Sequence, residues 1–286
     1  MKKRLIKMSI KGIALMVVLV MGSCDNEDST TIDEGSSIEV VELVASDEAD
    51  LISEEIANIG EDVYATEEIR ATSKAFFISN YLPDCVTITT VIVNGKKETD
   101  IDFGEGCELP NGNLLSGIIH LSYEKEVDMA TKTISLSLEN FTFNEVAVEG
   151  GASLDRKRSN DNGNPESHAV ASYNGVWPDG SAASFTGDRT REWIEGYGSG
   201  FWADNVFLIS AQGTYTGKTG DVYSRETISP LRRELSCRFL VSGVVEVSKN
   251  DTSVSLDFGD GTCDAKGMLT FPNGETKEIF LRRFNK

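Results

Sequence analysis

The apolar residues of the chain follow three successive patterns. An unbroken apolar run occupies residues 13–21, a spacing of three and four residues follows at about 47–68, and apolar and polar residues alternate from about residue 74 onwards. A spacing of three or four places apolar side chains on one face of a helix, whereas alternation places them on one face of a strand. The patterns therefore predict one helix followed by a long β region.

The helical pattern predicts a single short amphipathic helix within residues 46–73. Ser46 is the expected N-cap, and acidic residues follow it in the first turn, where the helix dipole favours negative charge. The apolar stripe consists of Leu51, Ile52, Ile56, Ile59 and Val63. We expect this stripe to pack on the domain that follows, and a helix that binds a partner protein is the alternative.

The alternating region, residues 74–286, is expected to form an all-β domain with a mostly antiparallel sheet. A strand is expected at 86–93, and Asn94-Gly95 then predicts a hairpin turn because both residues tolerate positive φ. The polar stretch 156–167 is expected to be a mobile loop or a boundary. Further strands are expected near 118–123, 133–138, 141–148, 168–177, 183–194, 206–216, 222–228, 236–248, 252–258, 267–271 and 276–283.

Two parts of the β domain resemble each other. The sequence IDFGEGC at 101–107 matches LDFGDGTC at 256–263, and LSGII at 115–119 matches VSGVV at 241–245. We expect a duplicated β unit, with related halves at about 74–155 and 168–286. Chance similarity between glycine-rich β segments is the alternative.

The first 24 residues have the layout of a bacterial lipoprotein signal peptide. Basic residues precede the apolar run, which is too short for a membrane span of about 20 residues, and Met21-Gly22-Ser23-Cys24 resembles a lipobox. This predicts a signal peptide at 1–23 and acylation of Cys24, with palmitate-type chains that hold the protein on a membrane. An ordinary signal peptide or an uncleaved anchor is the alternative.

Acidic residues dominate the segment that follows Cys24. The formal net charge of the chain is −19, and Arg70 is the one basic residue between 25 and 70. A field of this sign excludes nucleic-acid binding through phosphate contacts. Residues 24–45 are expected to form an acidic flexible tether. Its start, Asp25-Asn26-Glu27-Asp28, also resembles the surface-export signals of Bacteroidota lipoproteins.

The four remaining cysteines are expected to form disulfides, because secretion places them in an oxidising compartment. Four cysteines allow three connectivities. We favour Cys85–Cys107 and Cys237–Cys263, since each pair brackets a stretch of similar length. A zinc site is disfavoured because the chain has no CxxC and two histidines.

Few residues have the pattern of a catalytic or metal site. The sequence DFGDG at 257–261 resembles the turn of polycystic-kidney-disease-type β modules, but a strand that ends in a glycine turn, with a core phenylalanine and a capping aspartate, explains it more simply. Asp257, Asp260 and Asp264 are calcium candidates in this region. No GxSxG surrounds a serine, so we expect no enzyme and no cofactor.

Aromatic residues gather between 177 and 202, close to glycines. Such rings often stack on sugars or on protein partners, although core packing is the commoner use of tryptophan. The candidate binding surface consists of Trp177, Trp193, Tyr197 and Trp202.

Several segments together resemble a group of Bacteroidota lipoproteins that have repeated DFGxGC β segments. The resemblance is carried by 189–194 (RTREWI), 202–207 (WADNVF), 236–238 (SCR), 241–243 (VSG) and the DFGDGTC stretch. It implies an all-β secreted domain on a lipid anchor at the outer membrane, on the cell surface or the periplasmic face, and it implies no reaction or ligand. We therefore expect a cell-envelope protein that binds a glycan or a protein partner. The alternatives are a structural envelope component, a carrier of apolar molecules or a carboxylate-based hydrolase.

Overall fold

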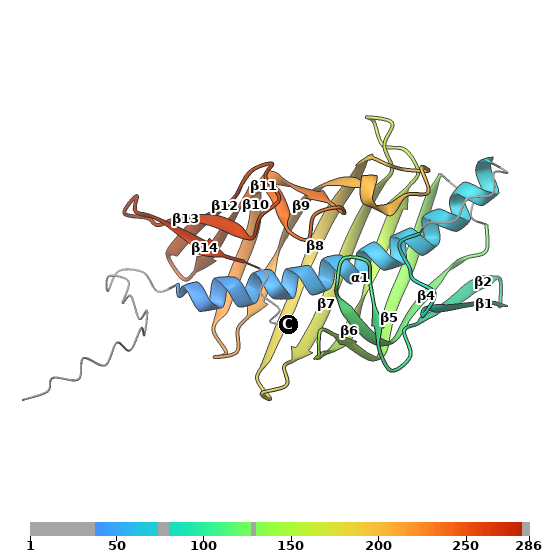
Figure 1. Ribbon diagram of the computed structural model, residues 1–286, viewed down its shortest axis with the longest axis horizontal. Coiled ribbons are helices and arrows are strands. Elements are labelled where there is room, and N and C mark those ends of the chain that lie inside the picture. Colours follow the sequence, from blue (N-terminus) through green and yellow to red (C-terminus); the bar gives the residue numbers. More distant parts are fainter. Residues whose placement is uncertain (1–37, 74–79, 127–129, 282–286) are drawn as a thin grey trace, which may run out of the picture. The chain divides into compact units, whose positions relative to one another are not determined.

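The computed structural model describes residues 38–73, 80–126 and 130–281 (Figure 1). These residues form a mostly antiparallel β-sheet and one long helix, which confirms the expected fold class. The signal peptide, Cys24 and residues 24–37 of the expected tether lie outside the described residues.

Helix α1 spans Val40–Ser73 and therefore begins before the expected start. Residues 40–45 are helical rather than part of a tether, because Leu43 and Ala45 are buried against the β domain. Ser46 is not an N-cap. Its hydroxyl donates to the Leu43 carbonyl at 3.0 Å, within the helix, and accepts from Arg225 at 3.0 Å.

Within the described residues, the strands form one continuous antiparallel sheet of fourteen strands. Its order is β1-β2-β4-β5-β6-β7-β8-β9-β10-β11-β12-β13-β14, and β3 pairs with β4. A 3-10 turn, η1 (Trp202–Asp204), precedes β9. The strands are β1 (Thr87–Val93), β2 (Lys96–Asp102), β3 (Cys107–Glu108), β4 (Leu114–Glu124), β5 (Thr131–Phe143), β6 (Val146–Lys157), β7 (Glu166–Val176), β8 (Ala182–Glu195), β9 (Val206–Thr216), β10 (Val222–Glu234), β11 (Leu240–Lys249), β12 (Thr252–Asp260), β13 (Lys266–Thr270) and β14 (Thr276–Phe280).

The turns between these strands include the predicted hairpin at Asn94-Gly95. The domain boundary considered for residues 156–167 is also a turn between two paired strands. Asn94 and Gly95 have φ values of 52° and 84° and connect β1 to β2. The polar stretch 156–167 is a hairpin connection, because β6 and β7 pair along their lengths up to Lys157 and Glu166. The sheet therefore runs through both predicted halves without a break.

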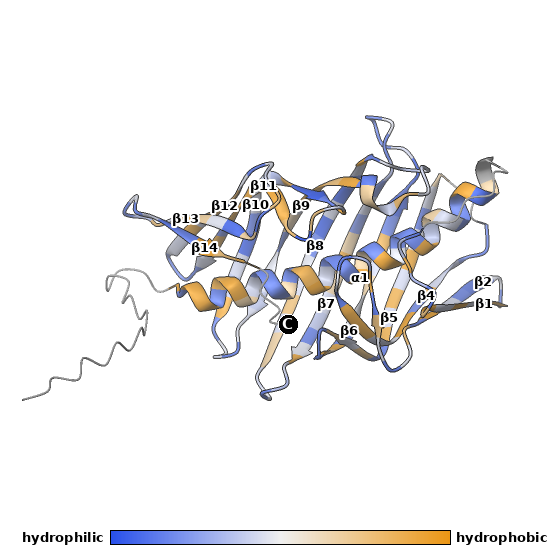
Figure 2. Cartoon of the chain, viewed as in Figure 1, coloured by the Kyte–Doolittle hydropathy of each residue, from blue (hydrophilic) through white to orange (hydrophobic). Residues whose placement is uncertain are grey.

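Helix α1 lies lengthwise across one face of the sheet (Figure 1). From Asp50 to Glu61 every residue is buried except Ala57, which is half-buried. The sheet supplies one side of this enclosure, while Tyr81, Asn111 and their neighbours reach the helix from the loops. Figure 2 shows apolar residues on α1 and on the strands behind it, interrupted by hydrophilic positions along the helix.

Both favoured disulfides are present. Cys85 is joined to Cys107 and Cys237 to Cys263, across sequence separations of 22 and 26 residues. Each lies beside one of the two similar DFG segments, so one disulfide fastens a corner near each end of the sheet.

The two DFG segments have the same local structure. The side chains of Asp102 and Asp257 accept hydrogen bonds from the backbone N–H of the glycine two residues later, at 2.8 and 2.9 Å. Phe103 and Phe258 are buried, as expected of core residues. Asp102 pairs with Ile118 and Asp257 with Val244, so the DFG and SG segments meet in the same register at both corners. The chain order is reversed, since DFG precedes its partner strand at the first corner and follows it at the second.

Candidate functional site

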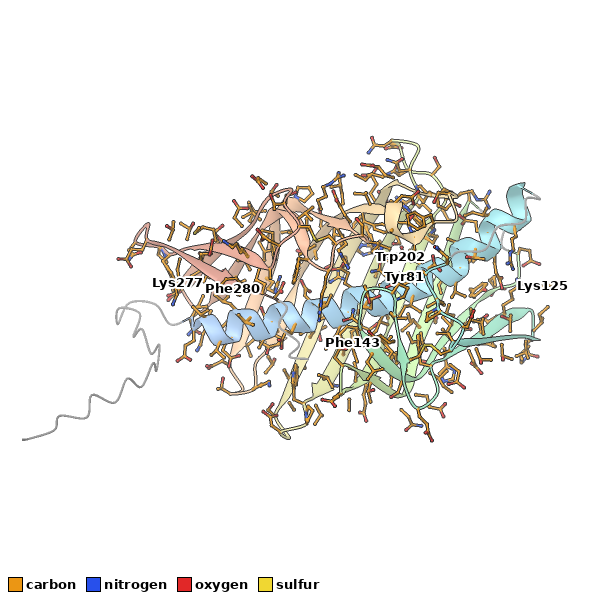
Figure 3. All side chains as sticks on the ribbon, viewed as in Figure 1. Tyr81, Lys125, Phe143, Trp202, Lys277 and Phe280 are labelled. Carbon is orange, nitrogen blue, oxygen red and sulfur yellow. A yellow bond between two sulfur atoms is a disulfide. The ribbon has the colours of Figure 1, made fainter. Side chains whose placement is uncertain are left out.

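The four aromatic residues of the candidate binding surface do not share one exposed face. Trp193 is buried and packs on Tyr197 and Phe207, with ring centroids 5.1 and 5.0 Å apart. Trp202 packs on Tyr81 beside α1 (Figure 3).

Trp177 lies at the other end of the strands from Trp193. It follows the end of β7 at Val176, whereas Trp193 is next to the pair Glu166–Glu192 at the start of β7. The Lys218 ammonium lies 4.3 Å from the Trp177 ring. Trp177 is therefore separated from Trp193 along the strands, and the buried Trp193 serves packing, which is the commoner use of tryptophan.

The three calcium candidates each cap a separate turn. The side chains of Asp257, Asp260 and Asp264 each accept a hydrogen bond from the backbone N–H group two residues later in the chain. Across the described parts of the chain, no three acidic, histidine or cysteine side chains group together in a way that could hold a metal ion.

A row of ion pairs fastens α1 to the sheet, and all of them are buried except the half-buried pair Glu67–Lys97; none of the patterns described above predicted this row. Asp50 contacts Arg189 at 3.1 Å and Arg225 at 3.0 Å, and Glu54 contacts Arg233 at 2.6 Å. Further along the helix lie the pairs Glu61–Arg191 at 3.2 Å, Glu68–Arg156 at 3.6 Å and Glu67–Lys97. The signal was present in the sequence, because Arg189 and Arg191 alternate with Trp193 on the inward face of β8.

Glu55 lies in the middle of this row but has no arginine in direct contact. It is fully buried, and its carboxylate accepts from the amides of Asn111 at 2.9 Å and Asn113 at 3.4 Å. Burial raises the pKa of Glu55 to about 7, although the charge of Arg233 partly opposes the shift. This group therefore changes its charge near neutral pH.

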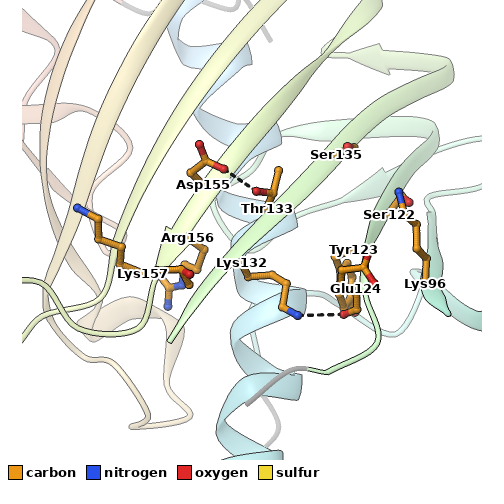
Figure 4. Close-up of a pocket in the computed structure, with 11 residues that line it drawn as sticks. Lys96, Ser122, Tyr123, Glu124, Lys132, Thr133, Ser135, Asp155, Arg156 and Lys157 are labelled. Carbon is orange, nitrogen blue, oxygen red and sulfur yellow. Dashed lines mark hydrogen bonds between the residues drawn. The ribbon is translucent and has the colours of Figure 1, made fainter. Parts of the chain in front are cut away.

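A hollow lies on the outward face of β4, β5 and β6, opposite α1 (Figure 4). Its volume is about 630 Å³. Exposed hydroxyl, ammonium and carboxylate groups surround it, while inward-facing Tyr123, Lys132 and Arg156 lie beneath. The outward residues are Lys96, Ser122, Glu124, Thr131, Thr133, Ser135, Asp155 and Lys157.

Hydrogen bonds hold part of this lining in place. Thr133 donates to Asp155 at 2.7 Å, and Lys157 donates to Glu166 at 3.1 Å. The hydroxyl of Ser122 donates to Glu98 at 2.9 Å. The lining offers both donors and acceptors on paired strands, which suits a polar ligand with many hydroxyl groups.

A histidine lies further along the same outward face. His120 is 2.7 Å from Asp100 and 3.1 Å from Glu139. Partial burial lowers the pKa of His120, but hydrogen bonds to the two carboxylates outweigh it and leave the pKa above its ordinary value. When protonated, His120 offsets part of the negative charge of Asp100 and Glu139 on this face.

A smaller hollow separates α1 from β1. It measures about 530 Å³, and its wall includes Val63, Leu82 and Ile88 together with Glu67 and Arg70. Apolar and charged groups share this wall, so it is not a dry cavity.

The chain matches no protein-family model, no curated protein and no solved structure. Among the described residues, no helix is both long enough and apolar enough to cross a membrane.

Proposed function

We propose that this protein is a lipid-anchored component of the cell envelope that binds a glycan on the outward face of β4–β6. The proposal of a glycan ligand rests on the 630 Å³ hollow, in which hydroxyls, two lysines and two carboxylates face outward. Sugars present many hydroxyls that both donate and accept, so a lining with both kinds of group can satisfy them. A protein partner on the same face is the alternative.

The anchor is proposed from the sequence. The basic residues, the apolar run and Cys24 suit a signal peptide at 1–23 and palmitate-type acylation at an outer membrane. The two disulfides are in keeping with an oxidising compartment. A Cys24→Ser variant should lose acyl labelling and move from the membrane to the soluble fraction, and retention in the membrane would contradict acylation at Cys24.

The carrier alternative has less support from the described residues. A carrier of apolar molecules needs a dry concave cavity, and here α1 fills the inner face with buried carboxylates and arginines. The helix would have to leave the sheet before an apolar molecule could enter.

The glycan proposal is tested by filling the hollow. Ser135→Trp places a large ring in it, and Ser172→Trp places the same ring on an exposed, outward position of β7 outside the hollow. On an array of envelope and host glycans, S135W should lose at least about tenfold in apparent affinity while S172W binds like the parent chain. Equal binding by both variants would remove the hollow as the site. No glycan binding by the parent chain, with capture of a protein by the same face, would favour the protein partner.

A further inference from the structure

The edge strand β1 is the most exposed apolar segment in the described sheet. All seven of its residues are exposed, and its large aliphatic side chains are about half accessible, as with Val91 at 52 % and Ile92 at 57 %. Figure 2 shows this apolar strand at one end of the sheet. Among the described strands, β2 alone pairs with it, so its other backbone edge is open to a further strand.

This edge lacks the devices that normally prevent strand addition. Proteins protect edge strands with charges, prolines, bulges or short length. Strand β1 reads TITTVIV, so every residue is β-branched and none is charged. The opposite edge, β14, has five residues, and its Glu278 is paired with Lys266 at 3.1 Å. The contrast indicates that β1 is built to be covered.

We propose that β1 pairs antiparallel with β1 of a second copy of this chain, about a two-fold axis at Thr90. In this register Ile88 faces Ile92 of the second copy and Thr89 faces Val91, so all seven residues find β-branched partners. Such cross-strand pairs stabilise antiparallel sheets, and no like charges face each other within the pair.

The charges on β2 favour the same arrangement. Asp102 lies beside the start of β1 and Lys96 lies beside its end, whereas Lys97 and Asp100 already pair with Glu67 and His120. The two-fold axis places the acidic end of one β2 opposite the basic end of the other, about 14 Å away at strand spacings near 4.8 Å. At this distance salt screens much of the electrostatic attraction. The remaining attraction orients the two copies but contributes little to the affinity of the dimer. The net charge of the chain is −19, so an edge strand without charged residues lets two copies approach with less repulsion than a charged edge would.

The first test measures association of the full chain in mild detergent by sedimentation velocity over a range of concentrations. A seven-residue strand pair is a small interface, so the dimer should be weak and should grow with concentration. Val91→Glu places a charge on the edge and should leave a monomer. Val222→Glu changes a similarly exposed valine, at 57 %, on an interior strand and should associate like the parent chain. A parent chain that stays monomeric, or that forms oligomers beyond the dimer, would overturn the proposal.

The second test fixes the register by cross-linking two differently tagged chains that are produced together. A Thr89→Cys chain and a Val91→Cys chain should form a disulfide-linked pair, because these positions face each other. A Thr87→Cys chain with the same Val91→Cys chain is two residues out of register and should give at least about fivefold less product. Equal products from both combinations would overturn the two-fold pairing, as would cross-linking of β1 to a different envelope protein in place of a second copy. Neither test depends on the outward hollow, so its outcome is independent of glycan binding.

Discussion

Glu55 and Glu54 are neighbours on α1 with opposite electrostatic environments. Glu54 contacts the guanidinium of Arg233 at 2.6 Å, whereas Glu55 accepts hydrogen bonds from neutral amides of Asn111 and Asn113. A buried carboxylate beside an arginine is stabilised as an anion, and one among neutral groups is favoured as the acid. Replacing Glu54 by glutamine is therefore expected to lower the stability of the fold, whereas replacing Glu55 by glutamine is expected to raise it.

Glu55→Gln should stabilise the protein at alkaline pH and have little effect at acidic pH. The pKa of Glu55 rises from 4.5 to about 7 on folding, so the folded state must bear an unfavourable charge above pH 7. Below pH 4.5 the group is protonated in both states, and the loss of stability develops between pH 4.5 and 7. Glutamine resembles the protonated acid and still accepts from the asparagines. Urea unfolding at pH 8 should show a gain of up to about 3 kcal/mol in the free energy of unfolding.

The matched control for this change is Glu54→Gln. It leaves Arg233 buried without its carboxylate and should cost about 3–5 kcal/mol at neutral pH. If E55Q were as destabilising as E54Q at pH 8, Glu55 would be a charged member of the ion-pair row, and its raised pKa would be wrong.

At the scale of single elements, local patterns in the sequence predicted most of the strands, the β1–β2 hairpin and both disulfides. Each of these depends on residues close together in the chain: alternation of apolar positions, Asn94-Gly95, and cysteines 22 and 26 residues apart. The expected strand at 141–148 was wrong, because Asn144 and Glu145 form the turn between β5 and β6, and β2 and β3 were not expected. The early start of α1 was missed because Val40 and Val41 have weak helix propensity, and burial of Leu43 overrides it. The burial of Trp193 within the candidate aromatic surface could not be predicted, because ring exposure depends on tertiary packing.

The ion-pair row could not be predicted in the same way. Asp50 and Arg189 are 139 residues apart, and Glu54 and Arg233 are 179 apart. These separations along the chain conceal which arginine pairs with which acidic position on α1. The helix is buried on nearly all sides, because arginines on the strands neutralise the acids that the sheet encloses.

Gly117 on β4 should be intolerant of any side chain. Its φ is +80°, and a Cβ atom would lie 2.3 Å from the carbonyl oxygen of Asn140 on β5. Gly117→Ala therefore combines backbone strain with a clash inside the sheet and should cost roughly 2–4 kcal/mol in a urea unfolding experiment. The control is Gly112→Ala, at φ +83° with nothing within 4 Å, which should cost only about 1–2 kcal/mol. Equal effects would mean that β4 and β5 can separate at this point without loss.

The disulfide between Cys237 and Cys263 should matter for thermal stability because it holds the segment after β10. The Cys237 carbonyl accepts a hydrogen bond from Arg233, the partner of Glu54, so this corner also supports the ion-pair row. A Cys237→Ser/Cys263→Ser variant, which leaves no free thiol at this corner, should lose about 3 kcal/mol and melt at a lower temperature. Reduction of the parent chain should abolish most of the difference. An unchanged melting temperature under oxidising conditions would show that the closed loop contributes little.

For the whole β domain, the main question is whether α1 is a permanent part of the core or can leave the sheet. Carboxylates along the helix pair with basic residues on β2, β6, β8 and β10. Removing the helix would expose buried apolar side chains and leave the buried arginines without their carboxylates. A state in which α1 has left an otherwise folded sheet is therefore unstable. We therefore expect α1 and the sheet to unfold together.

Hydrogen exchange measured by mass spectrometry tests this directly. Peptides from residues 50–61 of α1 should exchange as slowly as those from β7 and β8, because all of them require global unfolding. The first turn, where Val41 is 65 % exposed, should exchange faster and serves as an internal reference. Fast exchange at 50–61 with slow exchange in β7 and β8 would mean that α1 leaves the inner face while the sheet stays folded. That outcome would open a concave surface lined by arginines and aromatic rings, and it would move the carrier alternative ahead of a purely outward binding face.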